Sequence, residues 1–354
     1  MTGETQPGHG TAVTPSDPEE ALAAPLLRQR LLTRRTAITV AIAALIVGLG
    51  IWRAPINWSD AVARIRTASP PLYGLALVAY YVSFLVRGLR WKLLLRNVGD
   101  DRSTIPLTSI IITSFFVNCV VPAKLGDVYR AVLVRQRQGV GGTRALGTII
   151  AERLLDLVVL MGLLVLAGAA TFRSRVPRVL LPYLLVGGLL ALLGIGFVLA
   201  LSRGRGQRVL VRLPERVVER YENFRVGTVD ALTNLPAVTG LTVVVWGLEA
   251  TRLAFVVLAL HFGGGRLGPS AFLLIALVAA LLTTVPFLPG GLGLVETGMV
   301  LVLVTVGGLG RDRSVSIALL DRSISYGSLV VVGFLVFASS HLRAPRAQPQ
   351  RASP

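Results

Sequence analysis

The sequence predicts an all-α polytopic membrane protein with about six full spans and two broken helical hairpins, or eight spans. Three observations lead to this fold class. Of the 354 residues, 53% are hydrophobic and only 15% are charged, which is more apolar sequence than a water-soluble core absorbs. The apolar residues form separate long segments, many close to the ~20 residues that cross hydrocarbon as a helix. Two of these segments end in Pro and Gly, which break helices.

The membrane domain is expected to cover 36–340. It follows a tail, 1–35, that is rich in Gly, Pro, Thr and Glu and is expected to be disordered and cytoplasmic. The first helix, about 36–51, is interpreted as an uncleaved anchor because the leader is long and no small-residue cleavage site follows. A second disordered cytoplasmic tail is expected at 341–354. Further apolar segments run over about 72–89, 106–121, 145–170, 180–201, 238–261, 270–286, 290–308 and 315–338.

Segment 106–121 is too short to cross the membrane as a helix. At ~1.5 Å per residue it is about 24 Å long, against a hydrocarbon core of ~30 Å. We therefore expect it to form a re-entrant hairpin with the amphipathic stretch 125–138. This topology keeps the basic stretches 122–144 and 202–237 on the cytoplasmic side, together with both termini. Whether 270–308 is re-entrant or two full spans stays open, because both leave the C-terminus inside.

An internal repeat fits this topology. Val121-Pro122 through Asp127 resembles Val285-Pro286 through Gly293 and Glu296. Asp127 lies 25 residues before the dipeptide Glu152-Arg153, and Glu296 lies 25 residues before the dipeptide Asp321-Arg322. Repeat-like halves are expected at about 72–170 and 238–338, linked by a helix at 180–201 and a basic loop at 202–237. The extra helix between the halves predicts that they are inverted in the membrane, as in many transporters.

Ionisable residues inside the apolar segments are candidate site residues. A charge at the bilayer centre costs about 2.5–3.5 kcal/mol on insertion scales, so such residues face the protein interior and have partners. Glu152, Arg153 and Asp156 lie near the start of one segment, and Asp321-Arg322 is the matching group in the last. Each group is either a structural ion pair or a site for a lipid headgroup or a proton.

Two further charged groups lie within an apolar segment or at its end. Glu249 and Arg252 are three residues apart and are predicted to form a local pair within one helix. Arg87 and Arg90 share a helix face, and the guanidinium fork suits bidentate binding of phosphate. The alternative is that both arginines anchor the helix end at the membrane interface.

The two hairpin tips supply the remaining candidates, which are Asn118, Lys124, Asp127, Arg130, Pro289, Gly290, Gly291 and Glu296. Lys124 and Arg130 either hold a phosphate or are ordinary positive-inside charges. A helix start at Gly290-Gly291 would offer free N–H groups to an anion. Glu296 would already complement that helix end and repel an anion. A protonatable Glu296, which couples proton movement to transport, is therefore the preferred hypothesis.

Several function classes find no support in the sequence. One cysteine and three scattered histidines argue against a disulfide framework and a metal centre, and no cofactor is expected. The net charge of +18 could indicate nucleic acid, but the basic residues lie in short loops between apolar segments. Contact with anionic lipid headgroups is the better interpretation, so no nucleic-acid partner is expected. We find no phosphate-binding nucleotide loop and no Ser/His/Asp set, so the chain is expected not to be an enzyme.

These motifs resemble the flippase-like membrane domain of lysylphosphatidylglycerol synthases, in the stand-alone form without the aminoacyltransferase domain. The resemblance covers roughly 40–340. It rests on Arg87 through Trp91, Asn118 through Arg130, Glu152 through Asp156, Pro286 through Glu296, and Asp321-Arg322. It implies a prokaryotic plasma-membrane protein that moves a phospholipid or lipid-linked sugar between leaflets. Lys124 stands where that family more often has Arg, which keeps the charge but loses the bidentate fork.

Three hypotheses for function follow. The first is a flippase-like transporter whose cargo is a membrane phospholipid or a lipid-linked sugar. The second is a non-transporting membrane subunit that presents lipid to a separate partner transferase. The third is a secondary transporter for a small polar solute, which predicts an enclosed cavity instead of a laterally open groove. The sequence does not define the oligomeric state.

Overall fold

The computed structural model describes residues 58–121, 124–172, 181–204, 214–262, 267–284 and 288–342. All described residues belong to one compact unit. The described residues are helices and their connections, with no strand among them, which confirms the predicted all-α class. The expected helix at 36–51, the tail 1–35, Pro122, Pro286 and residues 343–354 lie outside the described residues.

Six helices in the described part of the chain are long and apolar enough to cross a membrane. They are α4 (Pro70–Asn97), α7 (Gly142–Phe172), α8 (Leu181–Ser202), α11 (Leu235–Ala259), the segment Pro289–Gly307 and the last helix, Arg311–Ser339. Two apolar helices are shorter, α5 (Thr104–Val120) and α12 (Pro269–Thr283). The number of these helices agrees with the six full spans that were predicted. The two sets differ, however, because the predicted span 36–51 is not described and Pro289–Gly307 was not among those six predicted spans.

The two hairpins are built alike. α5 is followed by α6 (Leu125–Gln138), and α12 is followed by a 3₁₀ turn, η4 (Pro289–Gly291), and α13 (Leu294–Gly307). α6 and α13 each contain 14 residues. Each begins after a residue of positive φ, Lys124 at 52° and Gly293 at 81°, and each ends at a left-handed glycine, Gly139 or Gly308. A left-handed glycine is a common helix end because it has no Cβ to clash.

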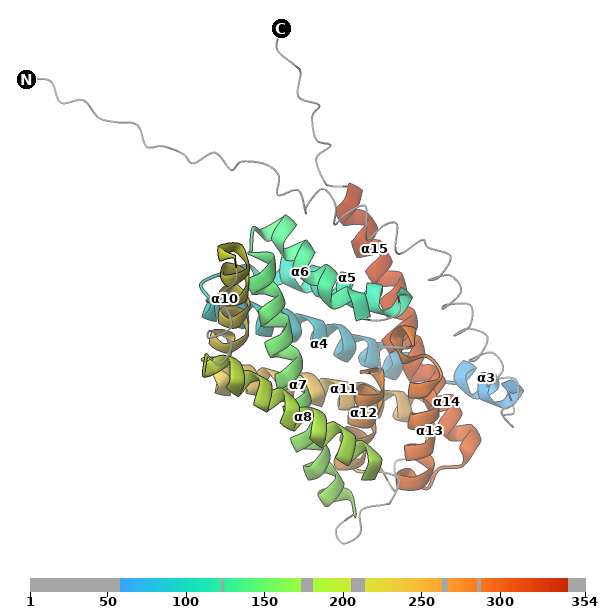
Figure 1. Ribbon diagram of the computed structural model, residues 1–354. Coiled ribbons are helices and arrows are strands. Elements are labelled where there is room, and N and C mark those ends of the chain that lie inside the picture. Colours follow the sequence, from blue (N-terminus) through green and yellow to red (C-terminus); the bar gives the residue numbers. More distant parts are fainter. Residues whose placement is uncertain are drawn as a thin grey trace, which may run out of the picture. The chain divides into compact units, whose positions relative to one another are not determined.

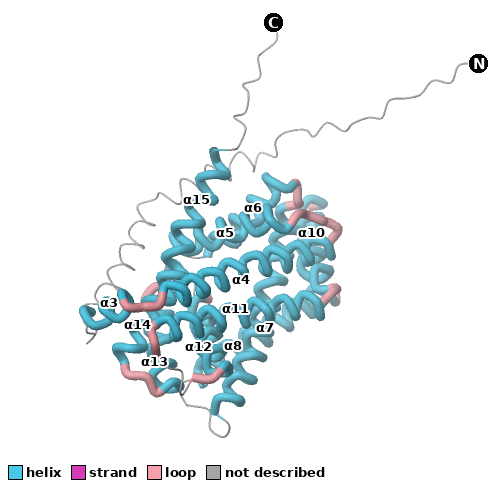
Figure 2. Tube along the Cα trace, turned by 180° about the vertical axis from the view of Figure 1, so that it is seen from behind, coloured by secondary structure: helices cyan, strands magenta, loops and turns pink. Residues whose placement is uncertain are grey.

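Helix contacts also match between the predicted halves. α4 packs against α5 as α11 packs against α12, and α5 contacts α15 (Leu329–Leu342) as α12 contacts α7. α4 and α11 pack against each other, and both views show them between the α5–α6 hairpin and the α12–α13 hairpin (Figures 1 and 2). An internal repeat produces matching contacts of this kind. The domain boundaries and the inversion in the membrane stay predictions.

The last apolar segment is not the single regular helix that was predicted for 315–338. It consists of α14 (Arg311–Arg322), a π-helical turn (Ser323–Ser328) and α15. Tyrosines of α4 bond to this turn: the Tyr80 hydroxyl donates to the Ser325 carbonyl at 2.9 Å, and Tyr81 shares a 2.9 Å hydrogen bond with Ser328. A π turn leaves carbonyl groups free for such contacts, which helical periodicity does not reveal.

The stretch 202–237, predicted as a basic loop, contains a further helix. α10 (Glu215–Val229) packs against α7. Most of its residues are charged or polar, but Tyr221, Phe224 and Thr228 recur at helical spacing and are buried or partly buried. A second short helix, α3 (Trp58–Arg66), precedes α4.

Candidate functional site

Asn118 closes the first hairpin. Its Oδ1 accepts the N–H of Gly126 at 2.8 Å, and Ser114 Oγ donates to the Gly126 carbonyl at 2.8 Å. The approach requires glycine, because a Cβ at position 126 would lie 2.1 Å from the Ser114 carbonyl oxygen. The contact joins α5 to α6, a role for Asn118 that the sequence did not indicate.

Each hairpin is tied to the following helix by an Arg–carboxylate pair. Arg153 of α7 donates to the two oxygens of Asp127 at 3.0 and 2.8 Å. Arg322 of α14 donates to Glu296 Oε1 at 2.7 Å and to the Gly290 carbonyl at 2.7 Å. Both ion pairs join residues 26 positions apart. Asp127 and Glu296 lie in the first turn of their helices, where a negative charge complements the helix dipole.

The second hairpin tip corrects one prediction. α13 begins at Leu294, with Gly293 as its N-cap, so the helix start expected at Gly290-Gly291 is wrong. Gly290 and Gly291 have φ values of 57° and 69°, which a right-handed helix cannot accommodate. They form the 3₁₀ turn with Pro289 instead. Glu296 Oε2 accepts the Gly293 N–H at 2.6 Å, so Glu296 does complement the start of its own helix.

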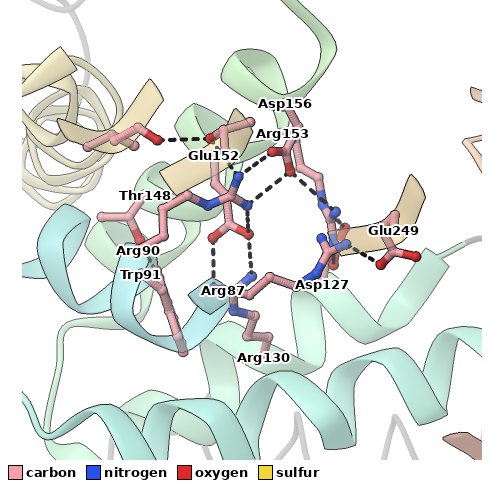
Figure 3. Close-up of polar contacts among 12 residues, drawn as sticks. Arg87, Arg90, Trp91, Asp127, Arg130, Thr148, Glu152, Arg153, Asp156 and Glu249 are labelled. Carbon is pink, nitrogen blue, oxygen red and sulfur yellow. Dashed lines mark hydrogen bonds and ion pairs between the residues drawn. The ribbon is translucent and has the colours of Figure 1, made fainter. Parts of the chain in front are cut away.

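Glu152 does not pair with its neighbour Arg153. It lies between Arg90 of α4 and Arg130 of α6 (Figure 3). Arg90 Nη2 lies 2.8 Å from Oε1, and Arg130 Nη2 lies 2.8 Å from Oε2. Both arginines have no exposed surface, and Glu152 is 2% exposed. Adjacent residues on a helix point in different directions, so Glu152 and Arg153 serve different partners.

Asp156 and an aromatic ring complete this buried cluster. Arg90 bonds to both oxygens of Asp156 and donates to Thr242 Oγ1 of α11 at 2.8 Å. The Arg130 guanidinium lies 3.8 Å from the ring centroid of Trp91, which is a cation–π contact. Two guanidinium groups and two carboxylates thus compensate one another in the interior, as burial of charge requires.

A second buried cluster joins α4, α11 and α14. Arg252 Nη2 lies 3.1 Å from Glu249 Oε2, so the predicted pair within α11 is present. It is not self-contained, which corrects the prediction: Arg87 Nη2 donates to Glu249 Oε1 at 3.0 Å, and Arg252 also bonds to Asp321. Helical spacing reveals the pair within one helix but not the partners from two others. These four side chains again balance two cations with two carboxylates.

A cavity of about 240 Å³ lies where the two hairpin tips meet α4, α7, α11 and the last helix. Cys119 and Val121 border it from the first hairpin, and Thr284 and Leu288 border it from the second. Aromatic side chains form much of the apolar wall, among them Phe84, Phe115, Trp246 and Tyr326.

The chain matches the family model described as the lysylphosphatidylglycerol synthase TM region over residues 37–333. The chain belongs to this family. The resemblance predicted from the motifs is therefore confirmed, and the protein is a multi-pass membrane protein of the lysylphosphatidylglycerol synthase TM family.

Curated relatives agree with this membership. UPF0104 membrane protein MJ1078 of Methanocaldococcus jannaschii is 30% identical over 229 residues, which are 63% of this chain and 93% of that protein. A UPF0104 membrane protein of Methanothermobacter thermautotrophicus is 26% identical over 85% of this chain and 92% of its own length. Glycosyltransferase AglD of Haloferax volcanii is 25% identical over 85% of this chain, which matches 54% of that protein.

In this member of the family, the predicted site residues fall into two groups. The cavity is lined by Arg87, Asn118, Lys124, Arg153, Asp156, Gly290, Asp321 and Arg322. Behind them lie Arg90, Asp127, Arg130, Glu152, Pro289, Gly291 and Glu296, several of which hold the lining residues in place. Glu249 and Arg252 also line the cavity, although the sequence placed them in a local pair. Their position in the middle of an apolar segment was the signal that could have found them.

Proposed function

We propose that this protein translocates a phospholipid or a lipid-linked sugar between membrane leaflets. The headgroup passes through the cavity while the acyl chains stay in the bilayer. The observation that carries this proposal is a cavity lined by charged side chains, bordered by two broken hairpins, within a bundle of apolar helices. Polar groups at membrane depth mark substrate pathways, and broken helices are built where they line a cavity.

Two measures of size support this proposal. α6, at 14 residues, is about 21 Å long, which is short of a ~30 Å hydrocarbon core and fits a re-entrant hairpin. The cavity, at about 240 Å³, is smaller than the ~300–1,000 Å³ of pockets that enclose a whole drug-sized ligand. A headgroup fits such a space, whereas two acyl chains do not.

Translocation is tested in liposomes with purified protein and fluorescent phospholipids. A membrane-impermeant reductant quenches the outer-leaflet label, and quenching well beyond half of the label reports translocation. We expect this result for the native chain and its loss in Arg153→Gln, which changes a cavity-lining residue. Arg225→Gln, in α10, is the matched control and is expected to retain translocation. Quenching that stops at the outer leaflet with anionic, zwitterionic and glycosylated lipids would overturn the proposal.

The proton-carrying role predicted for Glu296 needs a separate test. Glu296 accepts hydrogen bonds from Arg322 and the Gly293 N–H, so a structural role already accounts for its position. If Glu296 also carries protons, Glu296→Gln liposomes lose the response of translocation to an imposed pH gradient. A folded Glu296→Gln protein with an unchanged response would remove proton coupling through this residue.

A second candidate function is presentation of lipid to a transferase. The observation in its favour is that this chain matches only 54% of a relative named as a glycosyltransferase, so that relative carries additional sequence beyond the shared region. In that case the native chain does not translocate lipid by itself. Lipid modification would appear only when the chain is co-expressed with a partner enzyme.

A further inference from the structure

The charges around the cavity balance except at one residue. The guanidinium groups of Arg87, Arg252, Arg153 and Arg322 each bond to a carboxylate, and Arg90 and Arg130 do so behind the wall. Lys124 also lines the cavity. Among the described residues, no carboxylate lies within ion-pair distance of its ammonium group, so the site carries one uncompensated positive charge.

The backbone at Lys124 is unusual for lysine. Its φ is 52°, in the left-handed region that L-residues with a Cβ rarely adopt. The residue in the same place before α13 is Gly293, which also has a positive φ, 81°, but a ψ of −45° instead of the 36° of Lys124. A positive φ has no steric cost for glycine. Two hairpins built alike thus differ at this position. Lysine occupies a place that favours glycine, and unfavourable backbone conformations of this kind concentrate at functional sites.

A second donor, Arg153, lines the same cavity as Lys124, and the charges of the two side chains interact. Arg153 uses Nε and Nη2 for Asp127, while its Nη1 makes only a 4.0 Å contact with Asp156. The Arg153 side chain is 35% exposed, and both residues line the cavity. A phosphate oxygen placed between them would receive an ammonium N–H and a guanidinium N–H, which are strong charge-assisted donors.

We propose that Lys124 and Arg153 form a binding site for one phosphodiester group, and that Lys124 makes the cavity select lipids with a single net negative charge. This inference rests on the proposed function for its lipid, but binding is measured without transport. A zwitterionic lipid also has a phosphate, but its cationic group would add positive charge to a wall whose carboxylates are each already paired with arginine. Repulsion between that cationic group and the excess positive charge at Lys124 is unfavourable, so anionic lipids bind more tightly than zwitterionic ones.

Calorimetric titration of the full purified chain in detergent tests this selectivity. The probes are short-chain phosphatidylglycerol, short-chain phosphatidylcholine, and water-soluble glycerophosphoglycerol, which supplies the same diester without acyl chains. We expect phosphatidylglycerol to bind at least about tenfold more tightly than phosphatidylcholine. Glycerophosphoglycerol that binds as well as the lipid would identify a soluble diester as the ligand. Equal affinity for phosphatidylglycerol and phosphatidylcholine would overturn the proposal.

Three substitutions of Lys124 separate its charge from its backbone. Lys124→Gly and Lys124→Asn suit the left-handed conformation, so both are expected to fold with an unchanged or higher melting temperature. Both are expected to bind phosphatidylglycerol about tenfold to a hundredfold more weakly. Lys124→Arg keeps the charge and is expected to bind it nearly as tightly as the native chain. A folded Lys124→Gly protein with native affinity for phosphatidylglycerol would refute the site.

The binding and translocation experiments together separate failure of this binding site from failure of the proposed translocation. Selective binding that depends on Lys124, in a chain that does not move lipid in liposomes, supports this site and overturns translocation. Translocation that is equal for anionic and zwitterionic lipids, with no effect of Lys124→Gly on binding, supports the proposed function and overturns this site.

Discussion

Glu152 is the residue at which two guanidinium groups with no exposed surface meet. Glu152→Gln would leave Arg90 and Arg130 with less compensating charge inside the protein. Removing one partner of a buried ion pair costs about 3–5 kcal/mol, because the remaining charge stays buried. We expect a loss of that order in the free energy of unfolding, measured by chemical denaturation in detergent.

Glu222→Gln is the control for this substitution. Glu222 also pairs with an arginine, Arg225, but its side chain is 43% exposed and the pair lies within α10. Exposed pairs contribute less than about 1 kcal/mol. Equal losses of stability in the two variants would contradict the structural role assigned to Glu152.

Arg322 bonds to two acceptors at once, the Glu296 carboxylate and the Gly290 carbonyl. Lysine keeps the charge but presents one compact ammonium group, which cannot reproduce the fork of Arg322. We expect Arg322→Lys to lower the free energy of unfolding by about 1–2 kcal/mol, the value of a hydrogen bond to a charged group. Arg311→Lys, at the exposed start of α14, is expected to change it little. An unaltered unfolding curve for Arg322→Lys would show that the turn does not depend on this fork.

At the scale of the elements, the α5–α6 hairpin depends on Gly126. Ala at this position would place a methyl group 2.1 Å from the Ser114 carbonyl oxygen, so backbone has to move. Overpacking of this kind costs about 1–3 kcal/mol. We expect Gly126→Ala to lower the melting temperature. Gly162→Ala, within α7 where a Cβ meets no atom within 4 Å, is expected to leave it unchanged or raise it. The opposite order of melting temperatures would refute the close helix contact.

The sequence predicts the apolar helices well because their signal is local. The break between 106–121 and 125–138 was visible from Pro and Gly, and the described α5 and α6 end and begin there. The π turn at Ser323–Ser328 was not visible, because hydroxyl groups from α4 stabilise it across the fold. α10 was missed because its apolar face is short and lies among charges.

The same reasoning explains what the sequence reveals of the site. Glu152, Arg153, Asp321 and Arg322 stand out because charge is rare in apolar segments. Their partners are far along the chain: Arg90 and Glu152 are 62 residues apart, and Arg252 and Asp321 are 69 residues apart. Periodicity within one helix cannot show such pairs. The repeat spacing gave the only hint that Arg153 and Arg322 have equivalent roles.

At the scale of the whole molecule, the orientation in the membrane is predicted from charge. We expect α10 to face the cytoplasm and the start of α14 to face outside. In a Cys119→Ala background, a cysteine at exposed Glu219 is expected to react with an impermeant maleimide only from the cytoplasmic side. A cysteine at exposed Arg311 is expected to react only from the outside. Labelling of both positions from one side would contradict the predicted topology.

The partners of the buried ion pairs are far apart in the sequence, and this separation has a consequence for biosynthesis. α4 is synthesised before its partners, so Arg87 enters the membrane 162 residues ahead of Glu249. Until α11 arrives, that charge has to remain near water, at lipid headgroups or in the insertion machinery. The ion pair between Arg87 and Glu249 therefore forms only after α11 has been synthesised.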